Sequence, residues 1–413
     1  MSRRSAPGRD ANVPPGRRRP ARGLAALSVV GAARRAFPLW ARWPGRCPHP
    51  PPSGRPHRTP PAPLFGRTTL RGNLALAAAS AALGVLLSGC TALAEGAQDV
   101  IDQQQPQSRQ RMEHTLRTGH PDLWVNPETP AARQMRQWQL EGRTADAGLL
   151  RRIAEQPVAE WIGDHPETRV DAIVDAAERA GRTPVLAAYH IPYRDCGNHS
   201  AGGAGDAAAY RQWIRAVAAG IGSRRAIVVL EPDAVAQAVD GCVPQQLRSQ
   251  RFALLNDAVA TLSALPAARV YLDAGHPDWI KDTARLVEPL RLSGVDAADG
   301  FALNVSNFQP TRTTEEYGRR LSRALGGKPF VIDTSRNGNG PVQGVPASDE
   351  RAWCNPPGRA LGELPTLRTG RSGVDAFLWV KRPGESDGTC NGGPPAGDWW
   401  PRYALDLART AGG

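Results

Sequence analysis

Aspartates that follow short apolar runs are the residues of this sequence best suited to acid–base chemistry. Two nearby carboxyl groups can transfer a proton when one is protonated and the other is ionised. A lone Asp after a strand is more often a helix N-cap, but its Glu231-Pro232-Asp233 setting favours a chemical role for Asp233. The aspartates in such positions are Asp195, Asp233, Asp273, Asp333 and Asp387.

Two rival kinds of site are less well supported. Residues 384–388 match the nucleophile elbow G-x-S-x-G, but Pro383 precedes them and a Gly/Pro-rich loop follows, where the elbow needs a strand and then a helix. Neither His-Glu-x-x-His nor Cys-x-x-Cys occurs, and no G-x-G-x-x-G follows the first predicted strand. We therefore expect no cofactor and no metal. The rival that stays open is a metal-dependent hydrolase built from Asp195, Asp233, Asp273 and His276.

Tryptophans accompany these carboxylates, and that combination is typical of sugar binding. Apolar sugar faces stack on indole rings, while carboxylates, amides and amines bind the hydroxyl groups. Glycoside hydrolysis itself needs one protonated carboxyl and one ionised carboxylate flanking the bond. Trp161, Trp279 and Trp353 are candidate stacking residues, whereas Trp379 lies inside a predicted strand and is expected in the core.

The elements that must position these residues alternate along the chain. Short runs rich in β-formers are separated by segments with helical periodicity, which predicts a parallel α/β fold. The predicted strands are 184–189, 226–230, 269–272, 301–305, 330–332 and 376–380. The predicted helices are 168–180, 207–219, 245–262, 283–290, 314–325 and 402–411.

Polar residues follow every one of the predicted strands. A doubly wound sheet places its ligand near one switch point, whereas a barrel gathers the loops of all strands at one mouth. We therefore expect an α/β fold with a single parallel, TIM-like (β/α) barrel and its active site at the C-terminal strand ends.

Six segments, in order, resemble the signature regions of glycoside hydrolase family 6. The resemblance covers the chain from about Leu123 onward and implies a distorted barrel with fewer than eight strands. It also implies metal-independent, inverting hydrolysis of cellulose-type β-1,4-glucan. The segments are Tyr189–Ser200, Leu230–Asp233, Tyr271–His276, Ile332–Pro341, Trp353–Pro356 and Trp379–Gly388.

The resemblance assigns catalytic roles residue by residue. Asp233 matches the general acid, and Asp195 matches the carboxylate that supports it by sharing a proton or by raising its pKa through like charge. Asp387 matches the proposed base, which acts either directly or through a water chain involving Ser200. Tyr189 matches the tyrosine beneath the reactive sugar, where it favours ring distortion.

The same resemblance suggests a set of substrate-binding residues around these carboxylates. Asp273 and Arg194 are expected to order the charge network, and Asp333 is either a structural partner or a site residue. The positions that match sugar-binding residues are Trp161, His276, Trp279, Asn304, Trp353, Lys381 and Glu385.

Family members often carry a Trp seven residues after the proline that corresponds to Pro127, where this chain has Gln134. The missing stacking platform is either weaker here or supplied by Trp124 or Trp138.

Only the eight residues Asn391–Asp398 separate Cys390 from the last helical region, and members with tunnels carry a longer loop. We therefore expect an open cleft and endo-type cutting by a monomeric enzyme, with a β-1,4-glucan polysaccharide as its partner. The alternatives are mixed-linkage glucan or xyloglucan as substrate, or a non-catalytic glucan-binding lipoprotein.

The basic residues of the chain are concentrated at its start. Residues 1–89 contain 15 Arg and one acid, which leaves 36 basic and 38 acidic residues in 90–413. The body is therefore close to neutral, and we expect no nucleic-acid partner. Residues 1–66 are rich in Arg and Pro, which predicts a disordered leader or sequence upstream of the true translation start.

Residues 67–89 have the pattern of a signal peptide, with arginines before the apolar run Leu74 to Leu87. The run ends in Leu87-Ser88-Gly89-Cys90, which resembles a bacterial lipobox with Cys90 as the lipidated residue. Cleavage after Ala94 and an uncleaved anchor are the alternatives. Each of them exports the body, so we expect an extracellular enzyme that contacts the membrane only through a lipid anchor. A polar tether over 90–115 then precedes the catalytic domain at 116–413.

Export changes how the six cysteines are interpreted. Cys47 lies in the leader and Cys90 at the processing site, so four remain in an oxidising compartment. An even number there predicts two disulfides. The family resemblance and the chain order imply the pairs Cys196 with Cys242 and Cys354 with Cys390.

Overall fold

The computed structural model describes residues 123–346 and 348–410. The predicted leader, signal peptide and tether (1–66, 67–89 and 90–115), together with Cys90, lie outside the described residues and stay predictions. None of the helices within the described ranges combines the length and the apolar character that a membrane crossing needs.

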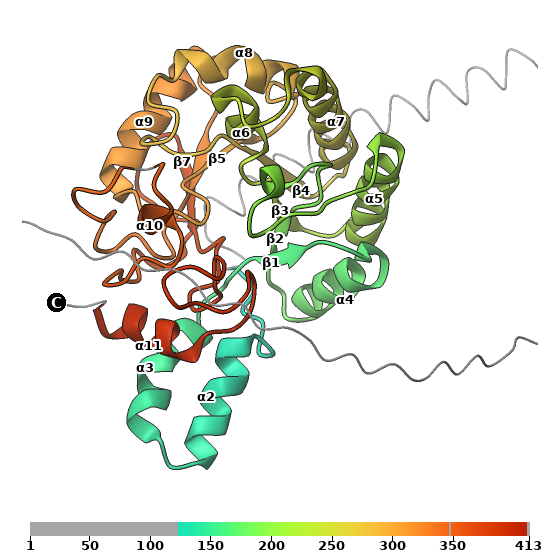
Figure 1. The fold of residues 1–413 in the computed structure, drawn as a ribbon. Helices are drawn as coiled ribbons and strands as arrows, with labels where there is room; N and C mark the ends of the chain where they lie inside the picture. The colour runs from blue at the N-terminus through green and yellow to red at the C-terminus, as the bar shows by residue number, and fades with distance from the viewer. Residues whose placement is uncertain (1–122, 347, 411–413) are drawn as a thin grey trace, which may run out of the picture. The chain divides into compact units, whose positions relative to one another are not determined.

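A parallel sheet of seven strands forms the centre of the fold, and its spatial order is the chain order β1 to β7. Such a sheet winds in one direction, as a barrel does, and has no switch point (Figure 1). The expected α/β barrel with fewer than eight strands is therefore confirmed. The strands are β1 (Glu160–Ile162), β2 (Val185–Ala188), β3 (Ala226–Leu230), β4 (Ala268–Asp273), β5 (Gly300–Leu303), β6 (Phe330–Asp333) and β7 (Val374–Leu378).

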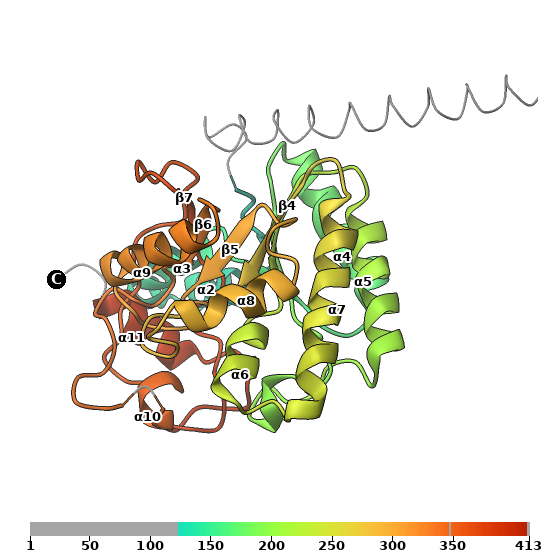
Figure 2. The same cartoon turned by 90° about the horizontal axis from the view of Figure 1, so that it is seen from above.

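Helices form an arc around the outside of the sheet (Figures 1 and 2). Helix α5 illustrates how the sequence makes them, since the Asp206 carboxylate caps its start by accepting from the Ala209 N–H at 2.8 Å. Tyr210, Ile214 and Val217 then form a buried stripe at helical spacing. The helices between strands are α4 (Pro166–Arg179), α5 (Ala207–Ile221), α6 (Ala234–Asp240), α7 (Gln245–Ser263), α8 (Ala284–Leu292), α9 (Thr311–Ala324) and α10 (Glu350–Trp353).

The strands are buried on both faces, which produces two core layers. In β3, Ala226, Val228 and Leu230 pack into the cluster that includes the helices, whereas Ile227 and Val229 pack into a second cluster formed mostly by strand residues. Removing one such side chain from water stabilises the fold by about 1.5–3 kcal/mol. The continuous apolar pattern of the strands therefore follows from burial on both sides.

The seam between the first and last strands is the weakest join of the sheet. Neighbouring strands elsewhere share at least three registered pairs, as β1 and β2 do through Glu160, Trp161 and Ile162. Near β1 and β7 the described residues show one isolated bridge, Val158 with Trp379. The sheet is thus curled into a barrel that is almost open on one side.

Three helices pack together beside this seam: α2 (Pro130–Leu140), α3 (Thr144–Ala154) and α11 (Pro401–Thr410). Trp138 is buried in their shared cluster, and the Arg143 guanidinium lies 4.2 Å from the centre of its indole ring. Trp138 therefore belongs to the core. Trp138 thus does not replace the stacking tryptophan that family members carry at the position of Gln134.

Candidate active site

Asp233 follows β3 at the start of α6, and its side chain makes no cap hydrogen bond there. Its φ of 70° is left-handed, a conformation that costs a non-glycine residue on the order of 1 kcal/mol. The backbone N–H donates to Asp273 Oδ1 at 2.9 Å. The carboxyl group is thus free of the ordinary capping role and available for chemistry.

The surroundings of Asp233 favour its protonated form. Burial raises its pKa well above the ordinary value, and the charges of Asp273 and then Asp195 raise it further. Burial also raises the pKa of Asp273, to about 7, against the stabilising backbone N–H groups of Asp233 and Gly275. Because these donors favour the anion of Asp273, the proton of the pair stays on Asp233. Asp195 was expected to be the nearest cause, but burial and Asp273 act more strongly.

Asp195 lies in the loop after β2, in a 3-10 turn with left-handed φ. Burial raises its pKa, while the backbone N–H of Ser200, which donates to Asp195 Oδ2 at 2.8 Å, and the charges of His199 and Arg194 oppose that rise. The structure therefore brings Asp195 and Ser200 together, as expected, through the backbone of the serine.

Tyr189 lies at the end of β2 between an aromatic and a cationic neighbour. Its ring meets Trp161 edge to face, with centroids 5.3 Å apart, and the Arg194 guanidinium lies 4.9 Å from its centre. Burial and the charges of Asp233 and Asp195 raise the pKa of Tyr189, so the phenol stays neutral near both carboxyls.

Arg194 holds the loop after β2 in place. Its guanidinium donates to the carbonyls of Tyr189 at 2.9 Å, Ser200 at 2.8 Å and Ala201 at 3.2 Å. These bonds fix the turn that carries Asp195. Arg194 therefore holds this loop through backbone carbonyls, and its part in ordering the charge network stays a prediction.

Asp387 is held in a different electrostatic setting. Its carboxylate contacts Arg336 Nη1 at 2.7 Å and Lys381 Nζ at 3.1 Å, and it accepts the Asn355 N–H at 3.0 Å. Burial works to raise the pKa of Asp387, but Arg336 and Lys381 outweigh it and the pKa is lowered. Asp387 is therefore ionised, and as a base it is weak because its oxygens are committed to cations.

Two polar residues at the ends of β5 and β6 hold loops. Asp333 accepts the backbone N–H groups of Ser306, Ser335 and Lys381, each at 2.9 Å, which makes it a structural partner. Asn304 has no exposed surface, and its amide bonds the backbone of Gln309 and Asp333. Both ends of its amide are thus used inside the protein, and the expectation that Asn304 binds sugar stays a prediction.

His276 and Trp353 line a cavity of about 210 Å³ together with residues of the loops after β4, β5 and β6. Burial lowers the pKa of His276 to about 4, so its imidazole is neutral at neutral pH. Trp279 lies beside it, with ring centroids 5.8 Å apart, and its indole N–H donates to Asp240 at 2.6 Å. These aromatic and polar groups lie in the loops after the strands and fit a sugar-binding surface at the C-terminal strand ends.

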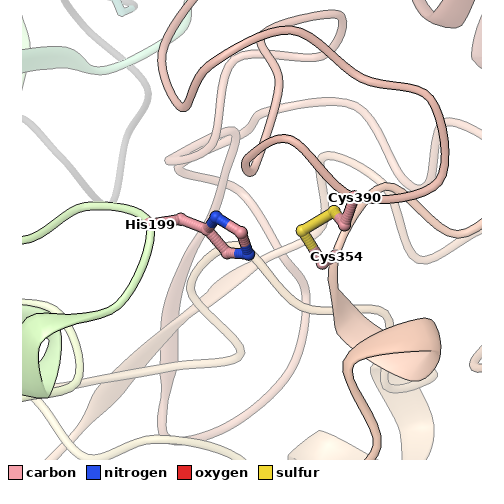
Figure 3. Close-up of side chains that lie close together, drawn as sticks. All are labelled: His199, Cys354 and Cys390. Atoms are coloured by element: carbon pink, nitrogen blue, oxygen red, sulfur yellow. A yellow bond between two sulfur atoms is a disulfide. The ribbon is translucent and has the colours of Figure 1, made fainter. Parts of the chain in front are cut away.

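Both predicted disulfides are confirmed: Cys196 with Cys242 and Cys354 with Cys390. Figure 3 shows the His199 ring pointing toward the second of them. Among residues 123–346 and 348–410, these two sulfurs and His199 are the only group of three with the spacing of a metal site. Oxidised cysteines offer no thiolate, so this group does not fit a metal ion. The proposed ligand set of Asp195, Asp233, Asp273 and His276 does not come together in this way.

The larger of the two cavities described, about 770 Å³, lies away from these carboxylates. Trp124 lines it, and the Trp124 N–H donates to Thr183 O just before β2 begins. The cavity therefore opens near the N-terminal strand ends, whereas catalytic residues of barrels lie at the C-terminal ends. Trp124 thus does not replace the missing platform either.

The residues that carry this site fall within one family match. The chain matches the sequence profile of "Glycosyl hydrolases family 6" over residues 118–411. The chain belongs to glycosyl hydrolase family 6.

Named relatives agree with this membership of family 6. Endoglucanase A of Cellulomonas fimi is 48% identical over 295 residues, which are 70% of this chain and 61% of that protein. Endoglucanase 1 of Streptomyces sp. (strain KSM-9) is 43% identical and covers 63% of this chain and 71% of its own. The chain thus spans about three fifths of the first of these relatives.

A solved family 6 structure is also similar. It is the endoglucanase Cel6 from Mycobacterium tuberculosis in complex with methyl-cellobiosyl-4-deoxy-4-thio-β-D-cellobioside, with a TM-score of 0.65 and 42% sequence identity. The match covers 72% of this chain and 99% of that chain.

Sequence reasoning missed two arginines of the family 6 site. Arg336, fully buried, pairs with Asp387, and Arg382 pairs with Glu385 at 2.7 Å. Both arginines lie in segments that resemble the family motifs, and the available signal was a cation just past a strand end with an acid three residues away, Asp333 for Arg336 and Glu385 for Arg382. Lys381 lies where expected, and its Nζ contacts Asp387 and the carbonyl of Ser386 at 3.1 Å.

Proposed function

We propose that this chain is an extracellular, endo-acting β-1,4-glucanase that hydrolyses cellulose or related soluble β-glucan with inversion. The observation that carries the proposal is Asp233: a buried, uncapped carboxyl with a raised pKa, next to Asp195 and Asp273, in a family 6 chain. A protein that only bound glucan would have no need for such a group.

Asp233 donates its proton to the leaving glycosidic oxygen. Burial, and then the charges of Asp273 and Asp195, raise its pKa, which favours the protonated form that a general acid needs. As the bond breaks, positive charge develops on the sugar, and the nearby carboxylates stabilise it. The neutral Tyr189 phenol lies under the reacting ring, where it favours distortion.

The attacking water loses its proton on the opposite face of the sugar. Asp387 carries a lowered pKa and two cationic partners, which supports an indirect role. Asp195 has a raised pKa and a bond to Ser200, so it accepts a proton more readily through a short water chain. Inversion needs room for that water, with roughly 6.5–9.5 Å between acid and base.

The substrate lies along aromatic and charged groups at the mouth of the barrel. Trp161, Trp279 and Trp353 offer stacking faces, while His276, Lys381 and Glu385 offer polar contacts. Residues 391–398 form a short loop beside the Asp387 segment, which supports an open cleft and endo attack. The endoglucanase relatives support the same mode.

Two disulfides support an oxidising, extracellular location. The signal peptide, the lipid anchor on Cys90 and the monomeric state belong to the same proposal. Mass spectrometry of the exported protein tests the first two: a lipidated N-terminus at Cys90 is expected, and an N-terminus at Glu95 would favour ordinary cleavage.

A reducing-sugar assay on carboxymethylcellulose, run with and without a chelator, tests the activity. We expect reducing ends in both arms, and loss of activity with chelator would revive the metal-dependent rival. Proton NMR of the first product should show the α-anomer, and the β-anomer would exclude inversion. No cleavage of carboxymethylcellulose, mixed-linkage glucan or xyloglucan would leave only the non-catalytic binding function.

A further inference from the structure

The seam between β1 and β7 depends on a few bonds across the barrel opening. The Ala159 N–H donates to Trp379 O at 2.9 Å. The indole N–H of Trp161 donates to Val380 O at 2.8 Å. A full strand pair would make a longer ladder, so this seam needs other bonds to keep the two strand ends in register.

Arg382, just after β7, supplies two such bonds across the seam and a third within its own loop, all from one side chain. Its Nε donates to Ala159 O at 2.9 Å, Nη2 to Glu160 Oε2 at 2.8 Å and Nη1 to Glu385 Oε1 at 2.7 Å. The Arg382 side chain is only 14% exposed, and those of Glu160 and Glu385 are 7% and 9% exposed. The guanidinium therefore joins the backbone of the first strand to a carboxylate of the active-site loop.

In the cluster of Arg382, Glu160 and Glu385, the charge of the guanidinium is compensated by carboxylates, and Glu160 has further partners. Glu160 also accepts from Asn126 Nδ2 at 2.6 Å and lies 3.5 Å from Arg169 of α4. Burial works to lower the pKa of Arg382, but Glu385 and Glu160 outweigh it, so the guanidinium stays charged. A buried ion pair of this geometry is retained only when its hydrogen bonds are satisfied.

We propose that Arg382 is a positioning residue: it closes the β1–β7 seam and fixes the Glu385 carboxylate for contact with the glucan. It does so without touching the substrate. The inference deepens the proposed glucanase function and rests on it. Trp161, one residue after Glu160, is held by the same clamp, so the stacking face and the carboxylate are positioned together.

The planar fork of arginine is what this position requires. Two nitrogens reach two carboxylates while the third reaches a carbonyl, and a lysine ammonium cannot make the three bonds in the same directions. Lysine would keep the charge, so Arg382→Lys separates charge from geometry. Arg382→Met removes both.

The test measures KM and kcat on cello-oligosaccharides for wild type, Arg382→Met, Arg382→Lys and Arg312→Met. Arg312 is 88% exposed and pairs with Glu316 on α9, so its variant should match wild type. We expect KM to rise about tenfold for Arg382→Met, with a smaller fall in kcat, as for loss of one charge-assisted bond. The KM of Arg382→Lys should lie between the KM of wild type and that of Arg382→Met. An unchanged KM in Arg382→Met would overturn the proposal.

A pH series separates positioning from mere stabilisation. Without the guanidinium, Glu160 and Glu385 repel each other when both are ionised, and a proton taken up at lower pH relieves that repulsion. The KM of Arg382→Met should therefore rise with increasing pH, whereas the KM of Arg382→Lys should keep the wild-type pH dependence. Parallel KM profiles in the Met variant and wild type would contradict the proposed role.

Glu160→Gln keeps the test decisive if Arg382→Met does not fold. It removes one carboxylate anchor and leaves Arg382 and Glu385 in place, so KM should rise by a few-fold and kcat should change less. No rise in KM would reject the clamp. If wild type itself releases no reducing ends from carboxymethylcellulose, the proposed function fails. If wild type is active and both variants keep its KM, only the clamp fails.

Discussion

Asp233 occupies the N-cap position of α6, immediately before Ala234, but its side chain makes no cap hydrogen bond. A residue with good capping chemistry that does not cap has another role, because an Asp cap typically stabilises a helix by about 1 kcal/mol. Here the carboxyl is buried and kept protonated by burial, Asp273 and Asp195. At the residue scale, that combination supports the proposal that Asp233 is the proton donor.

The pH dependence of activity should follow from these carboxyls. Asp233 must hold its proton, so kcat/KM falls as pH rises through its raised pKa. In Asp195→Asn one of the charges that raise this pKa is lost, so the basic limb should move to lower pH. The shift should be modest because burial is the larger cause, and kcat should fall on the order of 10²-fold. A basic limb that moves to higher pH would contradict the assignment.

The kinetics of Asp387→Asn should differ from those of a variant that lacks the general acid Asp233. The variant leaves Arg336 and Lys381 without their buried carboxylate, which should lower the free energy of unfolding by about 3–5 kcal/mol. Its kcat should fall equally on substrates with good and poor leaving groups, because protonation of the leaving oxygen is intact. Denaturant melts and paired kinetics measure both effects, and rescue by a good leaving group would count against this role.

The positions of most candidate site residues could be predicted from the sequence because they lie beyond the ends of strands. Tyr189, Asp233 and Lys381 lie within three residues of a strand end, whereas Asp195, Glu385 and Asp387 lie further along the loops after β2 and β7. The partners of these residues could not be predicted in the same way. Arg336 and Arg382 meet their acids across the sheet, 51 and 222 residues apart in the most distant cases. Only the fold shows that the amide of Asn304 is used internally.

At the scale of elements, Glu231 ties the end of β3 to the end of β2. Its carboxylate accepts the N–H groups of His190 at 3.0 Å and Ile191 at 3.0 Å. Arg251 of α7 reaches the same loop by donating to the carbonyls of Pro192 and Tyr193. These bonds fix the segment that leads from Tyr189 to Asp195.

Glu231 also gives the fold a pH-dependent stability. Burial raises its pKa from 4.5 to about 7, against bonds from His190, Ile191 and Tyr210. The folded state then keeps a proton that the unfolded state has lost, so the free energy of unfolding decreases as pH rises from 4.5 to 7, by about 3 kcal/mol.

The Glu231→Gln variant tests this linkage. Its free energy of unfolding should not show the decrease between pH 4.5 and 7 that Glu231 causes. At low pH the variant should be less stable than wild type by roughly 1–3 kcal/mol, because the amide has one hydrogen-bond acceptor fewer than the carboxyl group. Urea melts at several pH values compare it with wild type. A constant difference in the free energy of unfolding between pH 4.5 and 7 would contradict the linkage.

The predicted elements agree with the structure wherever a strand or helix carries a long periodic pattern. Six of the seven strands were predicted, and the segment 226–230 matches β3 at both ends. β1 was missed because it has three residues, Glu160–Ile162, one of them charged. Helices α2 and α3 were missed too, since their apolar stripes pack on α11, far away in the sequence.

At the scale of the whole molecule, the short loop of residues 391–398 supports a cleft that admits a chain at any point. Endo cutting should then lower the viscosity of carboxymethylcellulose several-fold before many reducing ends appear. Viscometry paired with a reducing-sugar assay measures this relation. A slow viscosity drop with almost pure cellobiose would indicate exo attack instead.

The central claim is that Asp233 protonates the leaving oxygen, and Asp233→Asn tests it most directly. We predict that kcat on cello-oligosaccharides falls on the order of 10²–10⁴-fold. On an aryl cellobioside with a dinitrophenolate leaving group the fall should be much smaller, because that group departs without a proton. Steady-state kinetics on the two substrates decides the matter. Near-complete activity of Asp233→Asn on cello-oligosaccharides, or an equal loss on both substrates, would contradict the account.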